Sequence, residues 1–320
     1  MDLEKSEIMR WEKHKYYAEL VKYLYNVRVV LDDKPLEFPG MAQRDFYGDA
    51  NNEPNYSGIA QHYGLEFRVG ERISVLKNLE EVIEGSNELV LAGTTSIDVN
   101  AEKKGKIKPI PHLALIGAVN TNDGKIIVGL RGRRYGKELT PERVRDMADN
   151  CYALAPGGGL TFKFNENPLT YTLEHEAIEE LGIKSNEIKS HTPIAIFKAN
   201  KIGPLGYKIL ESVSIILSSK EVIEKHKEAY EKYLSLCEKG INEKDACKRV
   251  AEEFGCGDCW EHSELLALEA NTNSIRKFLD NIPLVEPIDG TNYSYNRMCG
   301  IGVGSLLSIA GWFDKYSSVN

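Results

Sequence analysis

Three glutamates near the middle of the chain have a spacing that could hold a divalent cation. Glu176, Glu179 and Glu180 stand at positions i, i+3 and i+4, so on a helix their carboxylates share one face. Carboxylates crowded in this way repel one another, and a bound cation relieves the repulsion. Oxygen ligands of this kind suit Mg²⁺ or Mn²⁺, which keep open positions for water and phosphate. The alternative is an ordinary amphipathic helix with an acid-rich first half, which the helix dipole favours.

A glycine cluster precedes this helix and could bring backbone atoms close to a ligand. Gly157, Gly158 and Gly159 follow Pro156, and a short strand is predicted from Cys151 to Ala155 just before them. Glycines allow a close approach of the backbone to a metal ion or a phosphate group. Strand, glycines and acidic helix together predict a catalytic site more firmly than the glutamates alone.

This stretch resembles the Nudix box. Residues 175–183 read HEAIEELGI and match the family pattern Arg-Glu-apolar-x-Glu-Glu-x-Gly-apolar, except that His175 replaces the arginine. The 15 residues between Gly159 and His175 make a loop longer than the family's usual one, and Glu166 is the nearest match to its loop glutamate. The resemblance covers residues 110–315 and implies an α/β fold of the Nudix type, an α/β/α sandwich with a mixed sheet.

The resemblance also implies a reaction. Nudix enzymes use Mg²⁺ or Mn²⁺ to hydrolyse a nucleoside diphosphate linked to another group at the pyrophosphate. It makes Glu176, Glu179 and Glu180 metal ligands, and it gives Glu176 and Glu179 catalytic roles as well. A carbonyl group from Gly158 or Gly159 would complete one coordination sphere and contact the substrate.

Arginines at a strand end are candidates for phosphate binding. A hairpin is predicted with its turn at Asn122-Asp123-Gly124. Arg131, Arg133 and Arg134 follow its second strand, and the resemblance implies that the terminal arginine faces the phosphates. Arg131 and Arg134 are therefore expected to bind substrate, with solvated arginines on an exposed loop as the alternative.

The general base is expected on a later strand, predicted from Trp260 to Glu269. Glu261 and Glu264 are its candidates, and Glu264 is assigned the catalytic role. Many Nudix proteins take their base from a loop or strand after the box, so the assignment rests on the resemblance. Exposed acids at the end of a strand are the alternative interpretation.

Composition excludes several classes of protein. The 320-residue chain is 42% apolar and 28% charged, typical of a soluble globular protein, and its formal net charge is −8. An acidic chain is a poor partner for nucleic acid, which requires a basic patch. The N-terminus has no apolar signal segment, and the weakly polar run 300–313 is too short to span a membrane. We therefore expect a cytoplasmic protein without membrane or nucleic-acid partners.

Six cysteines do not form a secreted disulfide framework in a chain of this length. Cys256 and Cys259 have the spacing of half a zinc site, but Cys237, Cys247 and His262 do not complete any familiar pattern. A plain reduced pair and a zinc or redox site both remain open at this stage.

The element pattern predicts two domains. Residues 1–105 form an expected N-terminal α+β region, and residues 106–320 a Nudix-like domain with a charged helical insertion at 220–254. Helices are predicted for 7–25, 73–83, 273–279 and 295–313, and strands for 27–31, 65–69, 88–99, 113–121, 125–130, 193–200 and 207–217.

A nucleotide sugar is the expected substrate, cleaved to a nucleoside monophosphate and a sugar phosphate. The resemblance is closest in layout to larger Nudix proteins with an extra N-terminal region, and a homodimer is a further expectation. Phe46, Tyr47, Tyr56 and Tyr63 could stack on a base. A Nudix fold that binds nucleotide or protein without hydrolysis is the alternative from another class; a metal-independent structural protein is the third.

Overall fold

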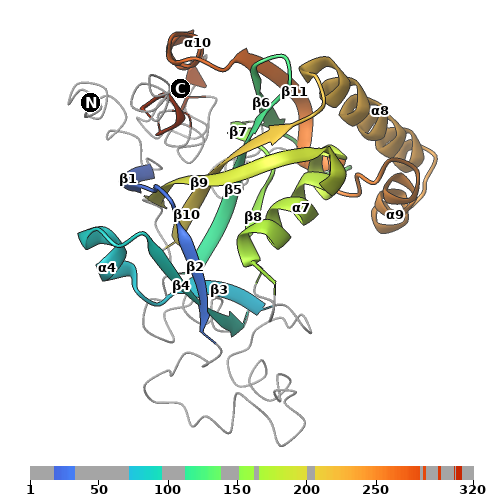
Figure 1. The fold of residues 1–320 in the computed structure, drawn as a ribbon. Coiled ribbons are helices and arrows are strands. Elements are labelled where there is room, and N and C mark those ends of the chain that lie inside the picture. Colours follow the sequence, from blue (N-terminus) through green and yellow to red (C-terminus); the bar gives the residue numbers. More distant parts are fainter. Residues whose placement is uncertain are drawn as a thin grey trace, which may run out of the picture.

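A computed structural model shows an α/β protein with one large mixed sheet (Figure 1). The structure describes residues 18–32, 72–95, 112–137, 151–161, 166–199, 206–281, 284–285, 295–296, 306 and 308–311. The strands are β1 (Ala18–Tyr23), β2 (Arg28–Asp32), β3 (Arg72–Leu76), β4 (Glu88–Thr95), β5 (His112–Asn120), β6 (Lys125–Arg131), β7 (Tyr152–Leu154), β8 (Gly157–Gly159), β9 (Ile188–Ala199), β10 (Gly206–Ile215), β11 (His262–Glu269), β12 (Leu284–Val285) and β13 (Tyr295–Asn296). The helices are α4 (Leu79–Glu84), α7 (Pro168–Leu181), α8 (Ser219–Glu238), α9 (Glu243–Phe254) and α10 (Thr272–Asn281), with 3₁₀ turns η1 (Ser185–Glu187) and η2 (Cys259–Glu261).

Eleven of the described strands belong to the main sheet. Its longest path runs β1-β9-β10-β5-β3-β4-β2; β6 connects β11 and β7 to β5, and β8 pairs with β5. The pairs β10/β5 and β2/β4 are parallel and the other pairs of this sheet are antiparallel, so the sheet is mixed. The main path brings β5 next to β10, and the branch through β6 brings β11 close to the glycine strand β8.

Helices cover both faces of the sheet. Alternate residues of β5 belong to different apolar clusters, Leu113 and Leu115 to one and Ile116 and Ala118 to the other, as the two-residue period of a strand requires. The first cluster contains the apolar side of α7, and the second contains Ile275 of α10. The expected α/β class, with helices on either side of a mixed sheet, is therefore confirmed.

Helix α7 carries the acidic motif, and local signals set both of its ends. The Asn167 side chain accepts the Leu169 N–H at 3.0 Å, and Pro168 occupies the first turn, where its missing N–H costs nothing. Gly182 ends the helix in the left-handed conformation with φ 68°. Leu173 and Leu181 are fully buried in the core, and Glu180 contacts Gly157 of β8 and His262 of β11.

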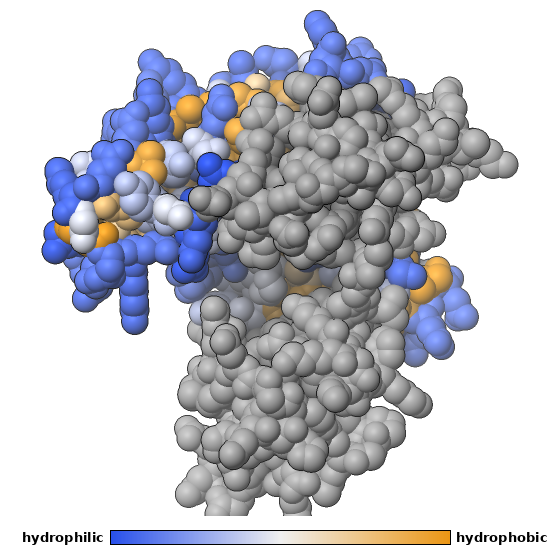
Figure 2. All heavy atoms as spheres, turned by 180° about the vertical axis from the view of Figure 1, so that it is seen from behind, coloured by the Kyte–Doolittle hydropathy of each residue, from blue (hydrophilic) through white to orange (hydrophobic). Residues whose placement is uncertain are grey.

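The insertion at 220–254 forms α8 and α9 and has its own small core. Ser218 and Glu221 form a capping box at the start of α8, and Asn242 caps α9. Tyr233 and Val250 are fully buried between the two helices, and the cluster continues into Cys256 and Cys259. Figure 2 shows mostly hydrophilic residues on the outer surface of this pair, as expected for charged helices.

Several sequence-based element predictions are wrong. The helix expected over 7–25 is strand β1 where the structure describes it, because Ala18–Tyr23 pairs with β9. The first half of the helix expected over 73–83 is strand β3, and only Leu79–Glu84 is helical. Tyr295–Asn296 is a strand inside the helix expected over 295–313, of which residues 306 and 308–311 are helical. In each case sheet pairing overrides a helical spacing of apolar residues.

The main sheet continues past the boundary expected near residue 105. Val75 of β3 pairs with His112 of β5, and β1 pairs with β9. Strands from both predicted domains thus share one sheet, while the division at 105 itself stays a prediction. The strand expected at 65–69 and the aromatic residues Phe46, Tyr47, Tyr56 and Tyr63 lie outside the described residues. Within the described part of the chain, no helix is long and apolar enough to cross a membrane.

Candidate functional site

Four glutamates from two elements meet beside the glycine strand. Glu176, Glu179 and Glu180 lie on the second half of α7, and Glu261 ends the turn η2 just before β11. A Cβ atom at Gly158 would collide with the Glu176 carboxylate, so only glycine lets this carboxylate reach the backbone of β8. The structure therefore brings the predicted glutamate face and the predicted glycines together.

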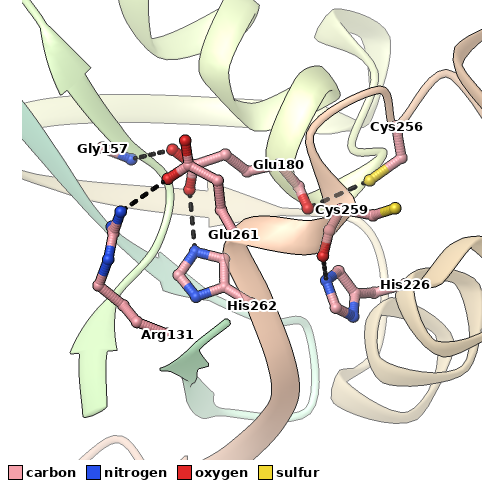
Figure 3. Close-up of polar contacts among 8 residues, drawn as sticks. All are labelled: Arg131, Gly157, Glu180, His226, Cys256, Cys259, Glu261 and His262. Atoms are coloured by element: carbon pink, nitrogen blue, oxygen red, sulfur yellow. Dashed lines mark hydrogen bonds and ion pairs between the residues drawn. The ribbon is translucent and has the colours of Figure 1, made fainter. Parts of the chain in front are cut away.

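Glu180 is the most deeply buried of the four and is held at both oxygens (Figure 3). Its Oε1 accepts the Gly157 N–H at 3.2 Å, and its Oε2 lies 3.0 Å from His262 Nε2. Only 2% of Glu180 and none of His262 is exposed to solvent. The carboxylate thus has a defined orientation between the glycine strand and β11.

Burial and mutual repulsion raise the pKa values of all four carboxyl groups. Burial, followed by the charges of Glu180 and Glu179, raises the pKa of Glu176 to about 8. Burial raises the pKa of Glu180 to about 7, although Arg131 acts in the opposite direction. Burial is also the main cause of the raised pKa values of Glu179 and Glu261. Negative charge at this site is therefore under-compensated, as in many functional sites.

Among the described residues, Arg131 is a cationic side chain that contacts the carboxylate of Glu261. Its Nη2 donates to Glu261 Oε2 at 3.0 Å, across the β6/β11 pair (Figure 3). Both side chains are partly buried, 27% and 22% exposed. The same guanidinium charge lowers the pKa values of Glu180 and Glu261 relative to what burial alone would produce. The structure thus places the predicted phosphate-binding arginine at the carboxylates.

Two buried histidines lie behind the carboxylates and stay neutral. Burial, together with the nearby Arg131, lowers the pKa of His262 to about 3. Burial, together with His262, lowers the pKa of His226 to about 3. His226 Nε2 lies 3.2 Å from the Cys259 carbonyl oxygen, which requires the proton to be on Nε2. Neither imidazole supplies positive charge to the site at neutral pH.

The segment after α9 also holds the C-terminal turn of α7. The Asp258 N–H donates to the Glu179 carbonyl oxygen at 2.9 Å, and Cys256 Sγ donates to the Glu180 carbonyl oxygen at 3.1 Å. These carbonyls belong to the last turn, which has no intrahelical donors of its own. The insertion therefore ends in a segment that anchors the helix carrying the glutamates.

Other predicted site residues lie apart from this cluster. Arg134 pairs with Glu243 of α9 at 3.0 Å and stacks on the Trp260 ring at 4.7 Å. Glu264 is exposed, on the face of β11 opposite to the buried Leu265. Gly159 is exposed at the end of β8 and pairs with Ala114. The structure thus brings together Glu176, Glu179, Glu180, Arg131 and Gly158 but not Arg134, Glu264 or Gly159.

The residues of this site are of the types that bind a hard divalent cation. Four carboxylates with raised pKa values lie close to a glycine backbone. Carboxylate and carbonyl oxygens are the ligands that Mg²⁺ and Mn²⁺ prefer. The His175 Nδ1 lies 3.0 Å from Glu179 Oε2, and Arg131 holds Glu261. In the described residues, no three His, Cys, Asp or Glu side chains are already arranged as a metal site. The residue types fit the cation, and the assignment of ligands is therefore a proposal.

Sequence reasoning missed His262 as a site residue and ranked Glu261 below Glu264. His262 follows Glu261 directly, yet only the fold reveals that its ring reaches Glu180, 82 positions away. Glycine at position 129, directly after the β-branched residues 126–128 of a strand, is the signal that could have indicated a close neighbour on β6. Of the cysteines that the structure describes, Cys151, Cys237, Cys247, Cys256 and Cys259 are all free thiols.

Comparisons with known proteins add little to this geometry. No family model matches the sequence, and no curated protein matches it. A crystal structure of a mutant of the Bacillus subtilis pyrophosphohydrolase BsRppH is similar to the chain with a TM-score of 0.32 and 13% sequence identity. The match covers 64% of this chain and 82% of that chain. A TM-score of this size carries no functional argument, so the function must be argued from the site.

Proposed function

We propose that the protein hydrolyses the pyrophosphate bond of a nucleoside diphosphate derivative with the help of Mg²⁺ or Mn²⁺. The observation that carries the proposal is the group of four carboxylates beside the glycine strand, of which Glu180 is buried and the other three are partly buried. Burial and mutual repulsion raise the pKa values of these groups. Burying several like charges costs stability, and cation binding would turn that cost into affinity. A purely structural role gives no reason for this arrangement.

Each residue has a role that follows from its place. Glu176, Glu179 and Glu180 would hold the cations, which when bound neutralise phosphate charge and polarise the attacked phosphorus. Gly158 keeps space for Glu176, and Arg131 would attract the phosphates. Arg134 is assigned no role in this proposal, because it pairs with α9.

The base is better assigned to Glu261 than to Glu264. Glu261 lies among the carboxylates and Arg131 fixes its orientation, whereas Glu264 is exposed on the other face of the strand. A carboxylate with a raised pKa is the stronger base, and burial raises the pKa of Glu261. Glu261 would therefore accept the proton of the attacking water.

A nucleotide sugar remains the proposed substrate. A small diphosphate requires only the cations and one arginine, which suits a chain with a net charge of −8. Nucleic acid would meet net repulsion. A cytoplasmic location and a homodimer stay predictions beside this proposal.

The test is product analysis by mass spectrometry with UDP-glucose, ADP-ribose, dinucleotides and nucleoside triphosphates in the presence of Mg²⁺. We expect a nucleoside monophosphate and a sugar phosphate from at least one nucleotide sugar. Glu261→Gln should abolish most turnover, whereas the matched variant Glu264→Gln should not. Cleavage of triphosphates alone would overturn the substrate class, and loss of activity in Glu264→Gln but not Glu261→Gln would overturn the base.

A second function has one observation in its favour. His175 engages the Glu179 carboxylate at 3.0 Å, at the position where the resembling family has arginine. This contact removes one potential ligand and suits a module that binds nucleotides without cleaving them. Binding of nucleotide sugars with no product from any of them, at millimolar Mg²⁺, would select this function.

A further inference from the structure

A histidine outside the predicted motif is attached to the central glutamate. His262 is the first residue of β11 and is completely buried, and its Nε2 lies 3.0 Å from Glu180 Oε2. The other Glu180 oxygen accepts the Gly157 N–H at 3.2 Å. Two donors from different strands therefore hold the two oxygens of one carboxylate, as Figure 3 shows. The carboxylate can neither rotate nor withdraw without breaking one of these contacts.

The neighbouring strand has space for this imidazole only because residue 129 is glycine. A Cβ atom at Gly129 would overlap the His262 ring at Nδ1. Gly129 lies in the interior of β6, opposite Leu265 of β11. Glycine weakens a strand interior and often marks a close approach of another group. In this strand the group that approaches is the ring of His262.

The hydrogen-bonding of the ring shows which of its atoms matters. Nε2 faces a carboxylate oxygen, so Nε2 carries the proton. Nδ1 is buried and has no hydrogen-bond partner among the described residues. An unpaired buried acceptor costs free energy that an apolar side chain of similar size would avoid. The Nε2–H donor to Glu180 is therefore the contribution that distinguishes histidine from an apolar residue at this position.

We propose that His262 is a positioning residue that holds Glu180 in the orientation in which this carboxylate binds a divalent cation. The inference rests on the proposed function in assigning Glu180 as a ligand. Hydrogen bonds from surrounding residues orient carboxylate ligands, and loss of such a partner lowers metal affinity about 10–100-fold. Gly129 serves the same role indirectly by leaving room for the ring.

Two amide substitutions separate this role from simple packing. His262→Gln places an amide donor near the position of Nε2, whereas the donor of His262→Asn is at the depth of Nδ1 and falls short of Glu180. Both variants bury one amide, so both have a similar cost in stability. His226→Asn is the matched control, because His226 is also buried and neutral but bonds to a backbone carbonyl. Gly129→Ala displaces the ring without changing its chemistry.

The primary measurement is Mn²⁺ binding without nucleotide, followed by water proton relaxation, with melting temperature as a check of folding. We expect His262→Asn and Gly129→Ala to weaken Mn²⁺ binding about 10–100-fold, His262→Gln to retain most of the affinity, and His226→Asn to change it little. Turnover should show a lower kcat for His262→Asn with little change in KM for the nucleotide.

Three results would overturn the proposal. They are wild-type Mn²⁺ affinity in His262→Asn, equal loss in His262→Asn and His226→Asn, and no Mn²⁺ binding by the wild-type protein. If His262→Asn does not fold, the comparison of Gly129→Ala with His226→Asn decides in the same way. If His226→Asn does not fold, the comparison of His262→Asn with His262→Gln decides. Failure of the hydrolysis proposal would look different, because the protein would bind Mn²⁺ with the expected ranking of variants and yet release no product.

Discussion

Among the residues that the structure describes, two buried glutamates contact a histidine, and the two pairs differ in what surrounds them. Glu211 of β10 is fully buried, and its Oε2 lies 2.7 Å from His191 Nδ1 of β9. His191 also contacts the Thr170 hydroxyl of α7 at 3.2 Å. Glu180 near the other end of α7 lies 3.0 Å from His262. The first pair joins β9 to β10 and the second joins β11 to α7, and the nitrogen–oxygen distances are similar.

The charge state differs because the exposure of the histidine differs. The His191 side chain is 22% exposed, and its hydrogen bond with Glu211 raises its pKa. His262 is fully buried, and burial lowers its pKa to about 3. One glutamate therefore has a partner that readily becomes cationic, whereas the other has a neutral donor. The charge of Glu211 can therefore be balanced by a protonated His191, whereas His262 stays neutral and cannot balance the charge of Glu180.

A candidate cation site differs from a structural contact in having negative charge that no nearby positive charge balances. Glu180 is surrounded by Glu176, Glu179 and Glu261, and a neutral imidazole orients it without cancelling this charge. Glu211 has a histidine of its own as counter-charge. We interpret His191–Glu211 as a fold-stabilising pair and the Glu180 cluster as the functional site.

Removing charge from the cluster should affect turnover most strongly. Glu180→Gln and Glu176→Gln should each lower kcat at least about 100-fold, more than the loss expected for a residue that only orients a ligand. The amide keeps the size of the side chain, so the fold should survive, which circular dichroism would show. Glu211→Gln is the matched control and should retain Mn²⁺ affinity. Wild-type rates in both cluster variants would place the active site elsewhere.

The stability of the metal-free protein should fall as pH rises through the pKa values of the cluster. The pKa of Glu176 is raised from 4.5 to about 8 in the folded protein. Below pH 4.5 the group is protonated in both states and does not reduce the free energy of unfolding. As the pH rises toward 8, ionisation favours the unfolded chain, so the protein loses stability. Solvent screening of this partly exposed group reduces the expected loss to roughly 2 kcal/mol.

Thermal unfolding at pH 5 and pH 8, with and without Mg²⁺, measures this effect. Mg²⁺ should raise the melting temperature more at pH 8 than at pH 5, because it binds the ionised carboxylates. Glu176→Gln should flatten the pH dependence of the melting temperature. The histidines titrate in both proteins, so the difference between the variant and the wild type isolates the effect of Glu176. An unchanged slope in this variant would contradict the assigned pKa.

Breaking the structural pair should reduce stability and leave cation binding unchanged. His191→Phe leaves Glu211 buried without its donor, which should cost about 2 kcal/mol. The pKa of His191 is raised, so the pair's contribution is present below pH 6.5 and declines as pH rises through the folded value. Chemical denaturation at pH 5.5 and 8 would measure it, with Mn²⁺ titration as the second measurement. A large loss of Mn²⁺ affinity would remove the distinction between the two pairs.

Restoring the arginine of the resembling motif should have the smallest effect. The His175 side chain is 49% exposed and pairs with Glu179, a contact that an arginine could also make. His175→Arg should therefore change stability by less than about 0.5 kcal/mol and leave turnover equal or slightly higher. Denaturation and kcat measurements check both. A strong loss of activity would indicate that His175 itself acts in the reaction.

The local parts of the site follow from short stretches of sequence. One helix contains the glutamate spacing, the Asn167 cap and the terminal Gly182. Each of these features depends on residues a few positions apart, so the local sequence suffices to predict it. The hairpin at Asn122-Asp123-Gly124 is equally local. The glycine run before α7 is predicted to bring backbone close to a metal ion or a phosphate group, and in the structure Gly158 lies against the Glu176 carboxylate.

The groups that complete the cluster come from distant parts of the chain and meet only through the fold. Arg131 and Glu261 are separated by 130 positions, and His262 and Glu180 by 82, so no local pattern links them. The β6/β11 pairing places Arg131 beside Glu261 and His262, and the packing of α7 brings Glu180 to His262. A one-residue change of register would exchange the buried His262 for a neighbour on the other face. The strand β1, whose local spacing favours a helix, shows the same cause, because its pairing with β9 outweighs local preference.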